Sequence, residues 1–233
     1  MIIYYLNVYE DNARNDPLRF KKYGCDIFTF DKRQAQKACI KHKDYFYGYV
    51  KECHNAQCKK VEDESDIFFC GRDKGRINYI KNIRRDIIKM GLTPKVIVVP
   101  ERHKKYAKDE IELLGERIPY DLIAQNIMSS KAILEIVEKG QTGMTERAME
   151  SIFFQKKLIT NNRYIIHYDL YNEKNIFVLG ERDLCELPAF LNEPYFPNRE
   201  LTNRYTVDSW LEKFFLSALF ILSCICKGFL SYW

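Results

Sequence analysis

The chain has 233 residues, of which 46% are hydrophobic and 30% are charged, and this composition is typical of a folded protein rather than a disordered one. Its length allows one large domain or two smaller ones with a buried core. The net charge of +5 suits an anionic small ligand or an acidic membrane face, and because no Lys/Arg block is interleaved with exposed aromatic residues we predict no nucleic-acid partner.

Strand-like and helix-like runs alternate along the chain from its first residues. The pattern predicts strands at 2–8 and 25–30, followed by a helix over 31–42 for which Asp31 is the expected N-cap. A charged stretch at 51–65, KECHNAQCKKVEDES, predicts a linker or an interdomain excursion between two regions.

From residue 66 onward the alternation becomes regular. Further strands are predicted at 66–71, 95–100, 132–137, 156–160 and 175–180, with helices over 76–91, 119–130 and 145–154. The helix over 76–91 is amphipathic, and the residues expected on its apolar face are Ile77, Ile80, Ile83, Ile87 and Ile88. Because parallel strands are joined through helices, the pattern predicts an α/β fold with a doubly wound parallel sheet.

The same pattern divides the chain into three parts. We expect a partial N-terminal α/β region at 1–60, a Rossmann-like domain at 61–212 and an apolar tail at 213–233. The uninterrupted apolar run of the tail is shorter than the roughly 20 residues that cross a bilayer. A packed or peripheral helix is therefore expected instead of an inserted one, and peripheral contact with the inner membrane is one role for it.

The eight cysteines do not predict a disulfide framework. In CHNAQC, the side chains of Cys53, His54 and Cys58 resemble a metal cluster, but no second pair follows at a zinc-like spacing, so we expect no metal. No secretory signal opens the sequence, which predicts reduced thiols and a cytoplasmic location. Four cysteines in or beside predicted elements are expected to be small buried apolar residues: Cys25, Cys39, Cys70 and Cys185.

The loop after the strand DIFFCG is a candidate diphosphate site. Ligands of doubly wound sheets bind beyond the carboxyl ends of the strands. At that end of the strand, Gly71 lets the backbone approach a ligand, and a helix N-terminus follows. Charge-assisted donors come from Arg72, Lys74 and Arg76. The alternative is a solvated basic turn, and composition alone leaves both interpretations open.

A second loop, after the strand AILEIV, has a similar character. Backbone amides near Gly143 and the hydroxyl of Thr145 can bind phosphate oxygens at the start of the next helix. One turn later, the carboxylate of Glu150 can reach back toward the loop and accept hydrogen bonds from ribose hydroxyls. The alternative is that Thr145 and Glu146 only start a helix and that Glu150 is a surface charge.

Taken together, these segments resemble GT-B glycosyltransferases. FFCGRDKGRINYIKNI is similar to the opening of their donor-binding C-terminal domain, where a strand ends in Gly-Arg and a Lys-Gly precedes the helix. IPYDLIAQNIMSSKAILEIV, the Gly/Thr loop and KKLITNN follow in the order of that domain. With KYGCDIFTFDKRQAQK included, the chain resembles bacterial lipopolysaccharide or capsular polysaccharide glycosyltransferases of the CgeB-like group, over roughly Tyr4 to Trp210.

The resemblance implies roles for individual residues. Arg72 and Lys74 match the basic pair that binds the diphosphate of the donor, and Thr145 lies in the phosphate loop. Glu150 matches the helix glutamate that binds the nucleotide ribose. The segment that borders the base contains Tyr120, Asp121 and Gln125.

Two features depart from the pattern of this family. Thr142 stands eight positions before Glu150, where many GT-B enzymes have a further glutamate. The N-terminal region is short, although it normally supplies the catalytic base, and Asp11 and Asp16 are the remaining candidates. An alternative function is therefore that of a shortened, non-catalytic relative that binds nucleotide or another protein.

The resemblance implies transfer of a sugar from a nucleotide diphosphate sugar to a bacterial surface glycan or its lipid-linked precursor. Cationic side chains would neutralise the departing diphosphate, and because no Asp-X-Asp motif follows a strand we expect no metal and no cofactor. A dehydrogenase is disfavoured, since no G-x-G-x-x-G turn follows the first strand. His167, in an apolar run that predicts a strand, is expected to be a core residue.

Overall fold

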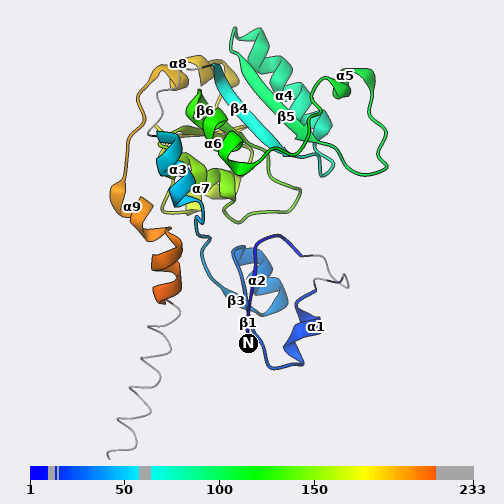
Figure 1. The fold of residues 1–233 in the computed structure, drawn as a ribbon, viewed down its shortest axis with the longest axis vertical. Helices are drawn as coiled ribbons and strands as arrows, with labels where there is room; N and C mark the ends of the chain where they lie inside the picture. Colours follow the sequence, from blue (N-terminus) through cyan, green and yellow to red (C-terminus); the bar gives the residue numbers. More distant parts are fainter. Residues whose placement is uncertain (10–13, 15, 58–63, 214–233) are drawn as a thin grey trace, which may run out of the picture.

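The computed structural model describes residues 1–9, 14, 16–57 and 64–213, whose strands form two parallel sheets (Figure 1). The smaller sheet has the strand order β1-β2-β3, and the larger has the order β5-β4-β6-β7-β8. The strands are β1 (Ile2–Tyr5), β2 (Asp26–Thr29), β3 (Lys41–His42), β4 (Ser65–Arg72), β5 (Pro94–Val99), β6 (Ser130–Glu135), β7 (Lys157–Thr160) and β8 (Ile176–Val178).

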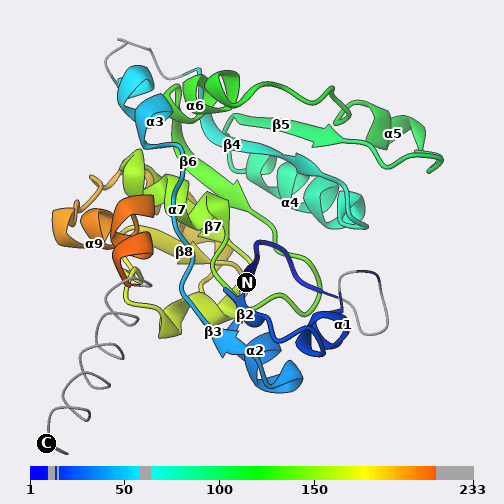
Figure 2. The ribbon, with the colours of Figure 1, turned by 60° about the horizontal axis from the view of Figure 1, so that its bottom comes forward.

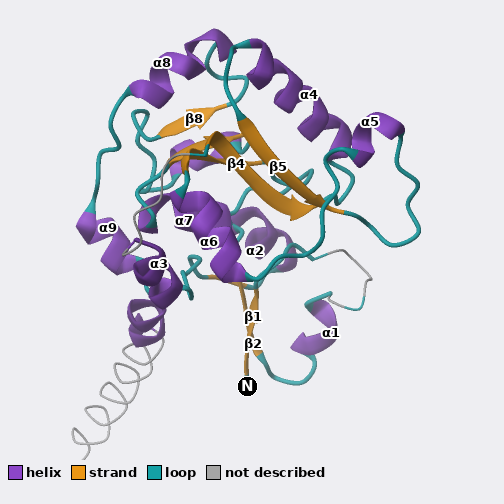
Figure 3. Ribbon diagram, turned by 45° about the horizontal axis from the view of Figure 1, so that its top comes forward, coloured by secondary structure: helices purple, strands orange, loops and turns teal. Residues whose placement is uncertain are grey.

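Helices cover both faces of the larger sheet (Figure 3). The α-helices are α1 (Leu18–Lys21), α2 (Lys32–Ala38), α3 (Val50–Gln57), α4 (Ile77–Lys89), α5 (Lys108–Ile111), α6 (Tyr120–Met128), α7 (Glu146–Phe153), α8 (Leu187–Asn192) and α9 (Arg199–Arg204). Two 3₁₀ helices are η1 (Arg163–His167) and η2 (Leu184–Glu186).

Side chains alternate between two hydrophobic clusters along the strands of the larger sheet. Ile67 and Leu134 belong to the cluster under α4 and α8, whereas Phe68 and Ile133 belong to the cluster under α3, α6, α7 and α9. This alternation follows from the two-residue period of a strand buried on both faces. The arrangement confirms the predicted doubly wound α/β fold.

The strand order of the larger sheet reverses between β4 and β6. β4 pairs with β5 on one side and with β6 on the other, so the chain crosses over β4 between those two strands. In such sheets a ligand crevice opens where the order reverses, beyond the carboxyl ends of the two strands. The unit formed by β1, β2, β3 and α2 lies at this end of the sheet (Figure 2).

Residues near the end of the described chain hold the smaller sheet in place. The backbone N–H of the buried Tyr47 donates to the carbonyl oxygen of Tyr205 at 2.8 Å. The indole N–H of Trp210 donates to the carbonyl oxygen of Asp44 at 2.7 Å, and its ring lies 4.8 Å from that of Tyr4 between centroids. The segment after β3 is therefore held at Asp44 and at Tyr47 by residues near the end of the described chain.

Helix α3 occupies part of the stretch in which the sequence predicts a linker. Cys53 of α3 is buried, and its thiol donates to the carbonyl oxygen of Phe153 at 3.2 Å. Tyr47, Val50 and Cys53 recur at a spacing of three and contact the hydrophobic cluster on this face of the sheet. The linker assignment is thus wrong for residues 51–57, which lie in α3, while the domain limits at 60 and 212 stay predictions.

The apolar face of α4 is narrower than predicted. Ile77, Ile80, Ile83 and Ile87 are buried, but Ile88 is 45% exposed. Each residue turns the helix by about 100°, so Ile88 lies at the edge of the stripe that the other isoleucines form.

Three predicted burial states are also wrong. Cys39 and Cys185 are exposed, because Cys39 is the C-cap of α2 and Cys185 lies within the surface helix η2, and neither belongs to the core. His167 is exposed as well, because its segment forms η1 instead of a strand.

Some predictions concern residues outside the described part of the chain, namely Asp11, Cys58 and the tail after residue 213. Among the helices of the described residues, none combines the length and the apolar character needed to span a membrane. The described residues likewise contain no group of three or more His, Cys, Asp or Glu side chains arranged to hold a metal ion.

Two isoleucines of α4 provide a matched test of this packing. Ile80→Ala should lower the free energy of unfolding by about 2–5 kcal/mol, since Ile80 is 0% exposed and its removal leaves a cavity. Ile88→Ala, in the same helix, should cost less than about 1 kcal/mol. Urea unfolding monitored by circular dichroism measures both values, and equal costs would contradict the assigned face of α4.

Candidate functional site

A cavity of about 230 Å³ lies where the strand order reverses, and we call it the switch-point cavity. Its walls come from the carboxyl ends of β4 and β6, the loop between β6 and α7, and the first turn of α7. The smaller-sheet region closes it with Asn7, Phe30 and Tyr45. The two glycine-bearing loops singled out in the sequence therefore share one hollow.

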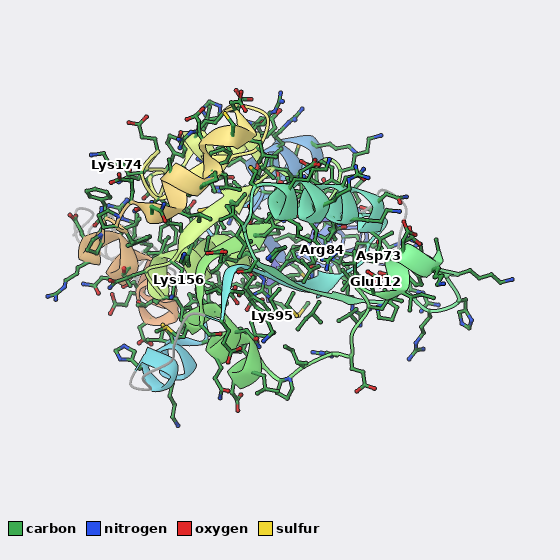
Figure 4. The ribbon with its side chains drawn as sticks, turned by 90° about the horizontal axis from the view of Figure 1, so that it is seen from above. Asp73, Arg84, Lys95, Glu112, Lys156 and Lys174 are labelled. Atoms are coloured by element: carbon green, nitrogen blue, oxygen red, sulfur yellow. The ribbon has the colours of Figure 1, made fainter. Side chains whose placement is uncertain are left out.

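The turn after β4 is held by a buried carboxylate. Asp73, labelled in Figure 4, is 0% exposed and accepts a hydrogen bond at 2.8 Å from the backbone N–H of Ile77 at the start of α4. Its other oxygen accepts from the ammonium of Lys104 and, at 3.1 Å, from the hydroxyl of Tyr106. Burial opposes ionisation of Asp73, but these hydrogen bonds outweigh it and hold the pKa below its usual range.

Two consecutive residues of this turn have positive φ angles, Lys74 at 45° and Gly75 at 76°. Such angles are readily adopted by glycine but are uncommon for a residue with a side chain. In this conformation the ammonium of Lys74 forms an ion pair with Glu138 in the loop after β6. The pair therefore spans the cavity from the end of β4 to the end of β6.

The arginines at the cavity differ in how their guanidinium groups are used. Arg76 donates to the carbonyl oxygens of Arg72 at 2.6 Å and of Ile136, so it links the ends of β4 and β6. Arg72 is exposed at the cavity, and its own guanidinium makes no hydrogen bond or ion pair with another described residue. Arg72 is thus the cation at this wall that can bind a ligand without giving up a partner.

Thr145 caps α7 and is fully engaged in that role. Its hydroxyl oxygen accepts from the backbone N–H groups of Arg147 at 3.1 Å and Ala148 at 3.3 Å, while the hydroxyl donates to Glu135. Glu135 is buried at the end of β6 and also accepts from the hydroxyl of Thr160. Burial raises the pKa of Glu135, although both hydroxyl groups favour its ionised form.

Two backbone amides of this loop bind an internal carboxylate, that of Asp31. Its oxygens accept from the backbone N–H groups of Thr142 and Gly143, each at 2.7 Å, and from the hydroxyl of Thr142 at 2.9 Å. Gly143 also allows close approach, because a Cβ there would lie 2.5 Å from the ring of Phe30. The amide of Gly143, predicted to bind a diphosphate, is therefore already used in this structure.

Glu150 lies below the floor of the cavity and is 0% exposed. Its carboxylate forms an ion pair with Arg147 and accepts a hydrogen bond at 3.0 Å from the hydroxyl of Tyr120. Burial raises the pKa of Glu150 to about 7, against the opposing effect of Arg147. Glu150, the residue predicted to bind the ribose, is thus a buried group whose charge changes near neutral pH.

A second cavity of about 380 Å³ adjoins the first, and we call it the tyrosine cavity. Cys70, Gly71, Arg72, Glu146 and Arg147 line both cavities. Its other walls include Tyr49 and Tyr120, whose rings are stacked with centroids 3.8 Å apart and planes 15° apart. Sequence reasoning missed Tyr49, which precedes α3 and had no predicted element to place it.

The other predicted site residues lie elsewhere. Asp121 is exposed and Gln125 is half-buried on α6, and neither lines these two cavities. Asp16 is buried and accepts a hydrogen bond at 2.9 Å from the backbone N–H of Leu18 in α1. It does not line the switch-point cavity, and Asp11 lies outside the described residues.

The fold is similar to that of a solved glycosyltransferase. No protein-family model matches the sequence, and comparison with curated proteins gives no match. Among solved structures, the fold is similar to the crystal structure of AviGT4, a glycosyltransferase involved in avilamycin A biosynthesis, with a TM-score of 0.54 and 9% identity. The match covers 84% of this chain and 64% of that chain, so the described fold spans less than two thirds of its neighbour.

The raised pKa of Glu150 gives a prediction about stability. Between its ordinary value of 4.5 and about 7, the native protein keeps a proton that the unfolded chain has lost, so stability falls as pH rises through this window. Glutamine does not titrate. The free energy of unfolding of Glu150→Gln, relative to that of wild type, should therefore rise by roughly 2–3 kcal/mol between pH 5 and pH 8. Urea unfolding at both pH values measures this gain. A difference that stays constant with pH would show that Glu150 is ionised throughout the window.

Proposed function

We propose that the chain is a glycosyltransferase that uses a nucleotide diphosphate sugar as donor. The observation that carries this proposal is the switch-point cavity, which is lined by Arg72 at the end of β4, by Lys74 in the turn after it and by the first turn of α7. The likeness of the fold to AviGT4 supports a transferase rather than another doubly wound protein. In such sheets the reversal of strand order is also where phosphate-bearing ligands bind.

The two adjoining cavities fit the two ends of a nucleotide. The base would lie against the stacked pair of Tyr49 and Tyr120, since flat aromatic faces favour stacking. The diphosphate would bind Arg72 in a bidentate manner, with Lys74 beside it. The ribose would fall at the junction lined by Arg147, behind which Glu150 lies.

Transfer would be a substitution at the anomeric carbon of the donor sugar. The hydroxyl oxygen of the acceptor forms a bond to that carbon, and the bond from carbon to the diphosphate oxygen breaks with its electron pair. Arg72 and Lys74 stabilise the charge of the departing nucleotide diphosphate, so we propose that no metal or cofactor is needed. The hydroxyl proton passes to a carboxylate that acts as the base. We propose Asp11 or Asp16 for this role, and Glu138 as a third candidate because it lines the cavity.

The finer assignment concerns the acceptor and the location. We propose a surface polysaccharide or lipopolysaccharide precursor of bacteria as acceptor, on the strength of the segments that resemble the CgeB-like group. The enzyme would then act in the cytoplasm, where nucleotide sugars are made. Residues 213–233 would bring it to the inner membrane face through their apolar character.

A second candidate is a nucleotide-binding protein without turnover. One observation that favours it is that the amides of Thr142 and Gly143 already donate to Asp31. Another is that Asp16 does not line the cavity. Incubation with UDP- and GDP-sugars separates the two candidates. Release of nucleotide diphosphate supports the transferase, whereas binding without release supports the second candidate.

Removal of Arg72 tests the proposed diphosphate site. Arg72→Ala should weaken binding of UDP or GDP by about 10- to 100-fold, because a charge-assisted hydrogen bond is worth about 1.5–3 kcal/mol. The affinity of Arg72→Lys for these nucleotides should lie between that of Arg72→Ala and that of wild type, since lysine keeps the charge but loses the bidentate geometry. Isothermal titration calorimetry measures the affinities.

Arg85→Ala is the matched control, because Arg85 is an exposed arginine further along α4 that does not line the cavity. It should bind the nucleotides as wild type does. Equal affinities of wild type and Arg72→Ala, or no binding of either nucleotide by wild type, would contradict the proposal.

A further inference from the structure

A third cavity, of about 490 Å³, lies at the same edge of the larger sheet, and we call it the edge cavity. Its walls come from the first turns of α4, the loop after β6 and the segment from the end of β7 into η1. Arg33 of α2 adds a side chain from the smaller-sheet unit. The proposed donor site, formed by the switch-point cavity and the tyrosine cavity, does not include it.

The edge cavity is separated from the switch-point cavity by one stretch of chain. Residues of the loop after β6, together with one arginine, line both hollows: Arg76, Ile136, Val137, Glu138 and Gln141. Arg76 fixes this wall, because its guanidinium donates to the carbonyl oxygen of Ile136. A ligand in the edge cavity therefore lies beside whatever occupies the switch-point cavity.

Positive charge predominates in the edge cavity. Arg33, Lys139 and Arg163 line it, and the carboxylate among its lining residues, Glu138, is paired with Lys74. Arg163 is paired with Glu181 at the surface. Arg33 instead donates to the neutral hydroxyl of Tyr164 at 2.6 Å and lies over its ring, so its charge is not neutralised by that contact. The cavity therefore favours a ligand that carries an anionic group.

The uncharged walls of the edge cavity suit a carbohydrate. Tyr79 and Tyr164 are 44% and 42% exposed, although large aromatic side chains are usually buried more fully. The face of Tyr79 can pack against the C–H groups of a sugar ring, whereas Arg33 lies over the ring of Tyr164. Asn161 accepts a hydrogen bond from the backbone N–H of Val137 at 2.7 Å through its carbonyl oxygen, which leaves its NH₂ group to donate to a sugar hydroxyl.

We propose that the edge cavity binds the acceptor as an acidic carbohydrate, a sugar that carries a carboxylate or a phosphate group. Arg33 binds the anionic group, and Tyr79 supports the sugar ring. The acceptor then lies next to the donor, on the other side of the loop residues that line both cavities. The role of this ligand as the acceptor rests on the proposed transferase function. The binding of an acidic carbohydrate follows from the cavity itself.

Calorimetric titration with three saccharides tests the proposal: trigalacturonic acid, glucose 6-phosphate and the neutral maltotriose. Wild type should bind at least one of the two acidic probes about tenfold or more tightly than maltotriose. The two acidic probes distinguish a carboxylate ligand from a phosphate ligand. Inorganic phosphate is titrated alongside, and binding of phosphate as tight as that of the acidic sugars would overturn the proposal in favour of a simple anion site.

Two variants at exposed positions separate the two kinds of contact. Arg33→Ala should reduce the affinity for the acidic probe about tenfold and leave the affinity for maltotriose unchanged. Tyr79→Ala should weaken the binding of both the acidic probe and maltotriose. Tyr23→Ala is the control, because Tyr23 is 69% exposed and does not line the edge cavity. UDP affinity should be unchanged in all three variants.

The outcomes for donor and acceptor are distinguishable. If wild type binds UDP but shows no preference for acidic saccharides, or if Arg33→Ala binds them normally, the inference is wrong and the transferase proposal stands. If wild type binds an acidic saccharide through Arg33 but binds no nucleotide, the transferase proposal is wrong and the cavity remains an acidic-saccharide site.

Discussion

A buried carboxylate, that of Asp31, joins the two sheets on which this structure depends. Its oxygens accept from the backbone N–H groups at the start of α2, at 3.0 Å from Arg33 and 3.1 Å from Gln34. They also accept from Thr142 and Gly143, more than a hundred residues later in the chain. A buried charge is costly unless hydrogen bonds replace its hydration, and here backbone donors from both units provide them. The loop before α7 in the larger unit thus stabilises an anion that belongs to the smaller unit.

This contact also decides which groups are left for a ligand. Amides at the start of a helix normally form an anion site, but here Asp31 is the anion that the loop before α7 binds. Thr145 is occupied by the cap of α7 and by Glu135. Under the proposed function, recognition of a diphosphate therefore falls to Arg72 at the end of β4 and Lys74 in the turn after it, both of which are exposed at the cavity.

The sequence predicts the framework of this site well and its detailed contacts poorly. Alternating strands and helices place Arg72 and Thr145 at one sheet edge, because the carboxyl ends of parallel strands meet there. Asp31 is correctly predicted as the N-cap of α2, since capping is a local property. Its bonds to Thr142 and the stacking of Tyr49 on Tyr120 depend on tertiary approach, which residue spacing does not encode.

The energies of the existing contacts indicate which cations can exchange partners when a diphosphate binds. Lys74 and Glu138 form a partly exposed pair, worth about 0–1 kcal/mol, so Lys74 can turn to a phosphate at little cost. Arg147 cannot leave Glu150 so easily, because removing one partner of a buried pair costs about 3–5 kcal/mol. That cost falls when Glu150 is protonated, and its pKa of about 7 places this change near neutral pH. For the proposed donor, Arg72 and Lys74 would therefore be the cations that contact the diphosphate first, and Arg147 would follow only where Glu150 holds a proton.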